Sequence, residues 1–139
     1  MSVAALEHVL ILSDDIEATR DFYCRVLGLT VGERPPLPFA GYWLYASGTP
    51  CLHVAQRGAY LAHARELGLS EPGPMVGGNV DHISFAASDA EGVRAALHAV
   101  GIAPVANEIA GTGIQQLFFE DPNGVRLEIN IKPLTAPGG

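Results

Sequence analysis

A chain of 139 residues, 48% of them hydrophobic and 17% charged, can bury the core of one globular domain, which excludes an intrinsically disordered protein. The formal net charge of -7 disfavours nucleic acid as a partner, because phosphate binding requires a basic surface. No apolar run approaches the roughly 18 residues that span a bilayer, so we expect no membrane partner. The start of the chain lacks the features of a signal peptide, and Cys24 and Cys51 fit free thiols, so we expect a cytoplasmic protein.

The first predicted elements are a strand and a helix within LEHVLILSDDIEATRDFY, which starts at Leu6. Four apolar residues at helical spacing predict the helix: Ile16, Phe22, Val26 and Leu27. Asp14 is the predicted N-cap, and Gly28 suits the left-handed conformation that ends many helices. A strand near 29–34 should follow, and GYWLYASGTPCLHVA (41–55) is typical of two strands joined by a turn at SGTP. A short helix at about 58–67 is predicted next.

The second half of the sequence repeats the first. VDHISFAASDAEGVRAAL starts at Val80 and matches the first stretch at an offset of 74, which aligns His8 with His82. Asp89 and Gly101 bound its predicted helix. A strand at 103–109 and two strands around DPNG within 113–131 complete the second half. Each half is therefore a strand, a helix and three strands, and the last three should be antiparallel because no long helix separates them.

Polar residues fall at matching places in the two halves. His53 follows His8 by 45 residues, and Glu128 follows His82 by 46, each in the last strand of its half. A single buried histidine is most simply explained as a core residue bonded to a carbonyl, and Glu128 alone as a solvated residue of an edge strand. Four such groups at repeated positions instead favour a metal site, since imidazoles and carboxylates bind Fe²⁺, Mn²⁺, Zn²⁺, Ni²⁺ or Co²⁺.

The two halves resemble the vicinal oxygen chelate superfamily, which groups glyoxalase I, extradiol dioxygenases, fosfomycin-resistance enzymes and bleomycin-resistance proteins. The resemblance covers about residues 5–132 and rests on EHVLILSDDIEATRDFYCRVLGL and LFFEDPNGVRLEI. It implies an α+β fold in which two repeated βαβββ modules form an open, cupped eight-stranded mixed sheet. We therefore expect one such domain over 1–139, with module one at about 5–56, a linker at 57–78 and module two at about 79–132.

The resemblance also implies where a divalent metal ion binds. The superfamily's ligands lie in the first and last strands of each module, which gives His8, His53, His82 and Glu128 in this chain. One divalent metal ion is expected, with Fe²⁺ (Fe2+) favoured and Mn²⁺, Zn²⁺, Ni²⁺ and Co²⁺ as alternatives. Metal-free members that only sequester a drug usually lack this set, so a sequestering protein is the least favoured interpretation.

Two enzyme classes remain open, with His53 and Glu128 as the candidate catalytic residues. In extradiol-type dioxygenases Fe²⁺ is held by two histidines and a glutamate, here His8, His82 and Glu128, and His53 lies where that family has an acid/base histidine. In glyoxalase-like lyases and isomerases a glutamate moves the proton of a metal-held enediolate. This chain has His53 where that branch usually has glutamate or glutamine, and its loops lack a basic cluster for glutathione. Dioxygenase-like ring cleavage is therefore narrowly favoured, with the glyoxalase-like reaction as the alternative.

The expected partners are a small-molecule substrate and a second copy of the chain. Three aromatic residues in GYWLYA are candidates for substrate binding, although ordinary sheet packing explains them equally well: Tyr42, Trp43 and Tyr45. Gln115 and Gln116 interrupt an otherwise apolar strand, so one of them is expected to bind substrate. An open sheet leaves strand edges and an apolar face uncovered, so we expect a homodimer.

Overall fold

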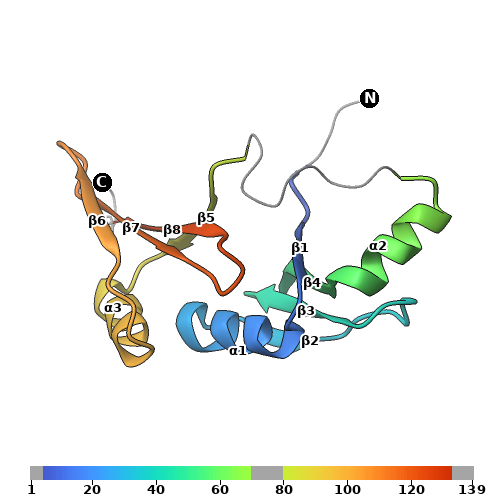
Figure 1. Cartoon of the computed structure of the whole chain (residues 1–139). Helices are drawn as coiled ribbons and strands as arrows, with labels where there is room; N and C mark the ends of the chain where they lie inside the picture. Colours follow the sequence, from blue (N-terminus) through green and yellow to red (C-terminus); the bar gives the residue numbers. More distant parts are fainter. Residues whose placement is uncertain (1–4, 70–79, 133–139) are drawn as a thin grey trace. The chain divides into compact units, whose positions relative to one another are not determined.

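The structure, a computed structural model, describes residues 5–69 and 80–132. The chain divides into two compact units, Met1–Gly73 and Pro74–Gly139, which are described here one at a time (Figure 1). The later part of the predicted linker, 70–78, lies outside the described residues.

The first unit contains one four-stranded sheet and two helices. In chain order these are β1 (Val9–Ser13), α1 (Ile16–Leu27), β2 (Thr30–Gly32), β3 (Gly41–Ala46), β4 (Thr49–Gln56) and α2 (Arg57–Glu66). The strand order is β1-β4-β3-β2, with β1 parallel to β4 and the other pairs antiparallel. The helix α2 falls in the predicted linker, but it packs against β4 and β1 of this unit.

The second unit repeats the same topology. It contains β5 (Ile83–Ala87), α3 (Ala90–Ala99), β6 (Val105–Ile109), β7 (Ile114–Glu120) and β8 (Arg126–Ile131). Its strand order is β5-β8-β7-β6, and the parallel pair is again formed by the first and last strands. The predicted α+β fold with two βαβββ modules is thus confirmed, and its eight strands form two open four-stranded mixed sheets.

Local signals in the sequence account for the limits of α1. Asp15, one residue after the predicted N-cap, accepts a hydrogen bond from the Ala18 backbone N–H at 3.0 Å. Asp14 instead pairs with Arg57, whose Nε lies 3.1 Å from Asp14 Oδ1. The helix ends at Gly28, whose φ of 69° is the left-handed conformation that glycine adopts without a steric penalty.

In the first unit α1 packs against β2, β3 and β4, and strand alternation in each sheet turns apolar and polar side chains to opposite faces. Alternation along β4 buries Leu52 and Val54 on the helix side and turns His53 the other way. Along β8, Leu127 and Ile129 are buried in the same manner, and Glu128 lies on the opposite face. We call this opposite face of each sheet its open face, and the candidate ligands of both units lie on it.

No helix within residues 5–69 and 80–132 combines the length and the apolar character needed to cross a bilayer.

Candidate functional site

The open face of the first unit carries a stack of three rings. His8 directly precedes β1, and its imidazole lies on that of His53 with ring centroids 3.8 Å apart and planes inclined by 12°. The other face of His53 stacks on the indole of Trp43 at 4.1 Å and 10°. Trp43 and His53 are opposite each other in the β3–β4 ladder, so the sheet itself aligns these two rings.

Hydrogen bonds assign the ring nitrogens of both histidines. His53 Nε2 lies 3.1 Å from the Pro50 carbonyl oxygen, which can only accept, so Nε2 carries the hydrogen and Nδ1 keeps its lone pair. His8 Nδ1 lies 2.9 Å from Glu7 Oε1, which leaves His8 Nε2 with the lone pair. Imidazole lone pairs lie in the ring plane. Because the two planes are nearly parallel, the lone pairs of His8 and His53 do not converge on one point.

Burial lowers the pKa of His53 below its ordinary value of 6.5, and the neighbouring His8 adds to the effect. The Pro50 carbonyl acts in the opposite direction, since it accepts a hydrogen bond from the ring, but it is the weaker influence. The surroundings of His53 therefore favour the neutral imidazole.

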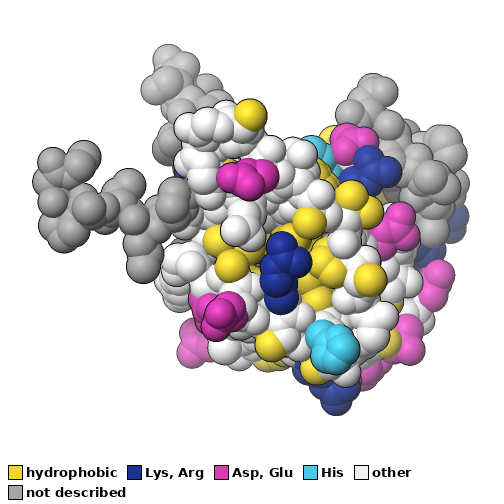
Figure 2. Space-filling view, turned by 90° about the vertical axis from the view of Figure 1, so that its left-hand side faces the viewer, with side chains coloured by type: hydrophobic (Ala, Val, Ile, Leu, Met, Phe, Trp, Pro, Cys, Tyr) yellow, Lys and Arg dark blue, Asp and Glu magenta, His cyan; other side chains and the backbone are white. Residues whose placement is uncertain are grey.

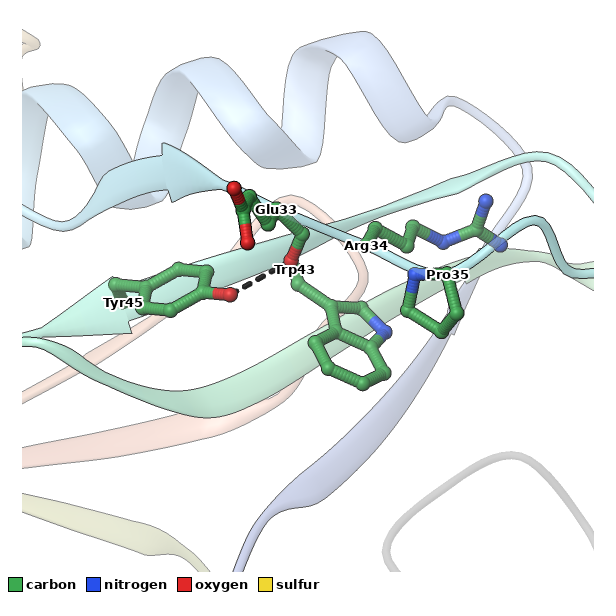
Figure 3. Close-up of a pocket in the computed structure, with 5 residues that line it drawn as sticks. All are labelled: Glu33, Arg34, Pro35, Trp43 and Tyr45. Carbon is green, nitrogen blue, oxygen red and sulfur yellow. Dashed lines mark hydrogen bonds between the residues drawn. The ribbon is translucent and has the colours of Figure 1, made fainter.

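A hollow of about 450 Å³ opens beside this stack in the first unit (Figure 3). Five residues line it: Glu33, Arg34, Pro35, Trp43 and Tyr45. The Tyr45 hydroxyl donates to the Glu33 carbonyl oxygen at 2.6 Å, which fixes one wall. Arg34 donates to the Phe39 carbonyl oxygen at 2.6 Å, which positions its guanidinium. The hollow thus combines two aromatic side chains with one carboxylate and one guanidinium.

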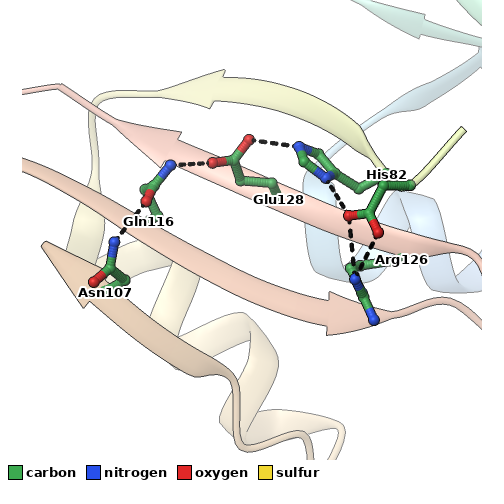
Figure 4. A network of polar contacts seen from close by, with 6 residues as sticks. His82, Asn107, Gln116, Arg126 and Glu128 are labelled. Atoms are coloured by element: carbon green, nitrogen blue, oxygen red, sulfur yellow. Dashed lines mark hydrogen bonds and ion pairs between the residues drawn. The ribbon is translucent and has the colours of Figure 1, made fainter. Parts of the chain in front are cut away.

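The open face of the second unit holds His82 and Glu128 side by side. His82 directly precedes β5, and its Nε2 lies 3.3 Å from Oε2 of Glu128 on β8 (Figure 4). Glu128 is 5% exposed, which is unusual for a carboxylate and requires polar partners around it. The ring of Phe118 meets His82 edge-on, with centroids 6.0 Å apart.

Asp81 and Arg126 support His82 from the other side of its ring. His82 Nδ1 lies 2.8 Å from Asp81 Oδ2, and Arg126 donates to both oxygens of Asp81 at 2.9 and 3.1 Å. Hydrogen bonds from His82 and then Arg126 lower the pKa of the Asp81 carboxyl group. An ionised Asp81 can only accept, so Nδ1 of His82 carries the hydrogen and Nε2 faces Glu128.

A chain of amides holds the second oxygen of Glu128. Gln116 on β7 donates from Nε2 to Glu128 Oε1, and Asn107 on β6 donates from Nδ2 to Gln116 Oε1 at 2.8 Å (Figure 4). Nearby on β8, the side-chain oxygen Oδ1 of Asn130 is buried without a hydrogen-bond partner among the described residues.

These contacts explain why the His82–Glu128 pair suits a cation. With Nδ1 of His82 committed to Asp81, two electron-rich atoms, Nε2 and Oε2, stand 3.3 Å apart and need a proton or a metal ion between them. Metal bonds to such atoms are about 2.0–2.2 Å long, so a spacing of this size allows both to bind one ion. The donor set of the second unit therefore fits a divalent metal.

The structure brings the predicted ligands together as two pairs, His8 with His53 and His82 with Glu128, one pair in each unit. In the part of the chain that the structure describes, three or more His, Cys, Asp or Glu side chains do not gather into one metal-holding group.

The predicted substrate-binding residues lie in different places. Trp43 and Tyr45 line the hollow, whereas Tyr42 points to the helix side, where Arg20 of α1 donates to its hydroxyl at 2.8 Å. Gln116 lies on the open face beside Glu128, whereas Gln115 shares the helix-side face with Leu117. We therefore leave Tyr42 and Gln115 out of the proposed site.

Sequence reasoning missed the acidic residues that hold the candidate histidines. Glu7 bonds His8 and Asp81 bonds His82, each through Nδ1 and each from the position directly before the histidine. The two pairs align at the same offset of 74 as the rest of the repeat, and that coincidence was visible in the sequence.

Comparison with known proteins agrees with this architecture. Residues 5–129 match the family described as the Glyoxalase/Bleomycin resistance protein/Dioxygenase superfamily. The chain is similar to the Arabidopsis thaliana protein named Glyoxylase I 4, with 32% identity over 132 residues, which cover 93% of this chain and 71% of the relative.

Two solved structures show the same fold. A glyoxylase/bleomycin resistance protein/dioxygenase domain from Frankia sp. EAN1pec has a TM-score of 0.71 at 16% identity, covering 97% of this chain and 96% of that one. Lactoylglutathione lyase from Agrobacterium tumefaciens has a TM-score of 0.64 at 19% identity, covering 94% and 95%. The superfamily includes glyoxalase I enzymes, and its members generally use a divalent metal ion. The repeated topology and the family match together establish that this chain belongs to the glyoxalase/bleomycin resistance protein/dioxygenase superfamily.

Proposed function

We propose that this protein is a divalent-metal-dependent enzyme that binds a small substrate through two adjacent oxygen atoms. The observation that carries the proposal is the contact between His82 Nε2 and Glu128 Oε2, made while Asp81 occupies the other nitrogen of His82. His8, the repeat equivalent of His82, is the third proposed ligand, with Nε2 free to bind. When bound, the ion supplies positive charge that stabilises negative charge developing on the substrate oxygens.

We assign His53 to proton transfer rather than to metal binding. Its ring is fixed between His8 and Trp43, and its lone pair does not converge with that of His8. The Pro50 carbonyl keeps the hydrogen on Nε2, so Nδ1 is the atom that accepts a proton from substrate. His53 therefore acts as an acid/base beside the ligand His8.

The hollow next to Trp43 gives the substrate a place to extend. Trp43 offers an aromatic surface within the ring stack that contains His53, and Tyr45 continues that surface. We propose that the part of the substrate remote from its two binding oxygens lies against Trp43 and Tyr45. Aromatic side chains bind flat or apolar groups well, so a substrate with such a group is favoured.

Of the two reaction classes, we propose the glyoxalase-type lyase reaction first. The similarity to a plant protein named Glyoxylase I 4 supports it. His53 replaces the glutamate or glutamine usual at this position in that class, so we propose that its imidazole moves the proton instead. The second candidate is ring cleavage by a dioxygenase. The donor set of two histidines and one carboxylate, His8, His82 and Glu128, favours it because this set is typical of Fe²⁺ oxygenases.

Metal analysis of single variants tests the site. His8→Ala, His82→Ala and Glu128→Ala should each lower the metal content after loading, whereas His98→Ala, which changes an exposed histidine of α3, should not. Equal metal content in all variants and the parent would reject the site. A parent protein that binds no metal after careful reloading would instead favour a metal-free sequestering protein.

A substrate panel separates the reaction classes. The parent is loaded with Ni²⁺ or Zn²⁺ and assayed for isomerisation of 2-oxoaldehyde–thiol adducts, which the first proposal expects to proceed. A second sample is loaded with Fe²⁺ without oxygen, mixed with catechols and then exposed to O₂. Oxygen uptake with a yellow ring-cleavage product that requires Fe²⁺, without isomerisation in the first arm, would replace the lyase assignment by the dioxygenase.

A further inference from the structure

We propose that Gln116 and Asn107 are positioning residues, a clamp that orients the carboxylate of Glu128 so that Oε2 alone is presented to the metal. The inference rests on the proposed function, since the orientation matters for chemistry only where Glu128 is a ligand. It assigns a role to two residues that touch neither the proposed ion nor the reacting atoms.

The two oxygens of Glu128 have different partners. Oε1 accepts a hydrogen bond from Gln116 Nε2, while Oε2 lies 3.3 Å from His82 Nε2. A carboxylate whose one oxygen is tied by an amide N–H cannot rotate freely about its last side-chain bond. Gln116 thereby keeps Oε1 occupied and leaves Oε2 beside the histidine.

The side-chain amide of Gln116 is itself oriented by Asn107. An amide side chain can present its NH₂ or its oxygen, and the two are close in shape. Asn107 Nδ2 donates to Gln116 Oε1 at 2.8 Å, so the oxygen of Gln116 faces Asn107 and its NH₂ faces Glu128. Because Asn107 and Gln116 are direct partners in the β6–β7 ladder, the backbone holds this pair in register.

Gln116 donates to Glu128 and not to Asn130, its direct neighbour on β8. Gln116 pairs with Asn130 in the β7–β8 ladder, yet Asn130 Oδ1 is buried without a partner among the described residues. A buried oxygen without a donor costs free energy, and a Gln116 amide turned to Asn130 would remove that cost. The amide is committed to the carboxylate instead.

The first unit has no equivalent of the Gln116 side chain at the matching position of its sheet. The ladder pair Phe118–Glu128 corresponds to Trp43–His53, so Gln116 corresponds to Gly41 in the first unit. A Cβ atom at Gly41 would collide with the Val54 carbonyl oxygen, so that position has no room for a side chain. The clamp is therefore present only where the last strand supplies a carboxylate.

Nuclear magnetic resonance of the metal-free protein tests the clamp directly. The side-chain NH₂ of Gln116 should be protected from hydrogen exchange, and Glu128→Ala should remove that protection. Asn107→Asp, which replaces the donor by an acceptor of similar shape, should also perturb it. A Gln116 amide that exchanges like an exposed glutamine in the parent overturns the inference, whatever the metal content.

Metal binding by calorimetry tests the consequence. Gln116→Met keeps the length of the side chain but removes its donor, and it should weaken metal affinity by about 10-fold, as loss of a hydrogen bond to a ligand typically does. Asn107→Ala should weaken affinity in the parent but not in the Gln116→Met background, because both act through one hydrogen bond to Glu128. Gln115→Met, on the helix-side face of the same strand, is the matched control and should bind as the parent does.

The outcomes distinguish this inference from the proposed function. Tight metal binding by the parent with unchanged affinity in Gln116→Met overturns the clamp and leaves the metal site intact. Additive losses from Asn107→Ala and Gln116→Met also overturn it, since independent effects indicate general damage to the sheet. A protected Gln116 amide in a parent that binds no metal confirms the hydrogen bond to Glu128 but rejects the proposed function, and with it the role of that bond in metal binding.

Discussion

At the scale of single residues, the candidate site depends on how each imidazole is held. Three histidines each have one ring nitrogen bonded to an oxygen acceptor: His8 to Glu7, His53 to Pro50 and His82 to Asp81. Such bonds decide which nitrogen carries the hydrogen and therefore which one can bind a metal or accept a proton. The nitrogen that keeps its lone pair is Nε2 in His8 and His82 and Nδ1 in His53. That difference accompanies the different roles proposed for them.

Removing the support of one ligand should weaken metal binding without removing a ligand. Asp81→Ala frees Nδ1 of His82, so the ring can turn and the second tautomer becomes accessible; we expect metal affinity to fall about 10- to 100-fold. Glu108→Ala, which removes an exposed carboxylate from β6, is the control for the change in net charge. Calorimetric titration with Zn²⁺ gives both values, and equal losses in the two variants would show that only charge matters.

His53→Ala should separate metal binding from turnover. Because His53 is assigned to proton transfer, the variant should keep the metal of the parent and lose turnover by about 10² to 10⁴, the range of a positioned acid/base. Metal content and kcat are measured on the same preparation. A drop in metal affinity as large as that of His8→Ala, well beyond the roughly 10- to 100-fold cost of losing a supporting residue, would identify His53 as a ligand and return the site to the four-ligand prediction.

At the scale of secondary structure, the sequence predicted the order and type of every described helix and strand. The errors concern the N-cap of α1, which is Asp15 and not Asp14, and the side chains that this helix buries. The predicted apolar stripe of α1 included Phe22 and Leu27, but the buried residues are Ile16, Thr19, Tyr23 and Val26. Thr19 escaped notice because its polarity is satisfied locally, with its hydroxyl 2.9 Å from that of Ser13. Hydrogen bonds of this kind depend on the neighbouring strand and are absent from a helical pattern.

The turn between β7 and β8 gives a test at this scale. Asp121 is buried, and its Oδ1 accepts from the backbone N–H groups of Asn123 and Val125 at 2.7 and 2.9 Å. Asp121→Ala leaves both donors without this acceptor, so we expect the free energy of unfolding to fall by about 1–3 kcal/mol. Asp121→Asn keeps the acceptor oxygen and should cost less. Urea denaturation measures both, and equal stability of Asp121→Ala and the parent would contradict the prediction.

At the scale of the whole molecule, the repeat carried most of what could be foreseen. It indicated the two modules, and it placed the four candidate ligands at equivalent positions of the two folds; that all four meet at one ion stays a prediction. It could not indicate Asn107, since that residue has a role only through the register of β6 against β7. The hollow beside Trp43 also escaped prediction, because its walls come from residues before and within β3 that only the folded sheet brings together.

We predict that the protein is a homodimer. The edge strand β6 is exposed along its whole length, and Val105 is 70% exposed. Apolar side chains are open to solvent on the side of the second unit where β6 and α3 lie (Figure 2). Such an edge and surface favour association with a second copy. Sedimentation velocity at micromolar concentration should show twice the chain mass, and a single species of 14.6 kDa would contradict the prediction.

The parallel pairing of the first and last strands in each unit has a consequence for unfolding. It places the start of each repeat against its end, so His8 meets His53 and His82 meets Glu128 across about 45 residues of sequence. Closing a loop of this length costs conformational entropy. An ion held by His82 and Glu128 would act as a reversible cross-link of the second unit and would bind only the closed chain. At a concentration 100 times its dissociation constant it would add about 2.7 kcal/mol to the stability of the fold. Chelation would then loosen first the strand β5, which depends on that closure, so the proposed metal would also stabilise the fold of the second unit.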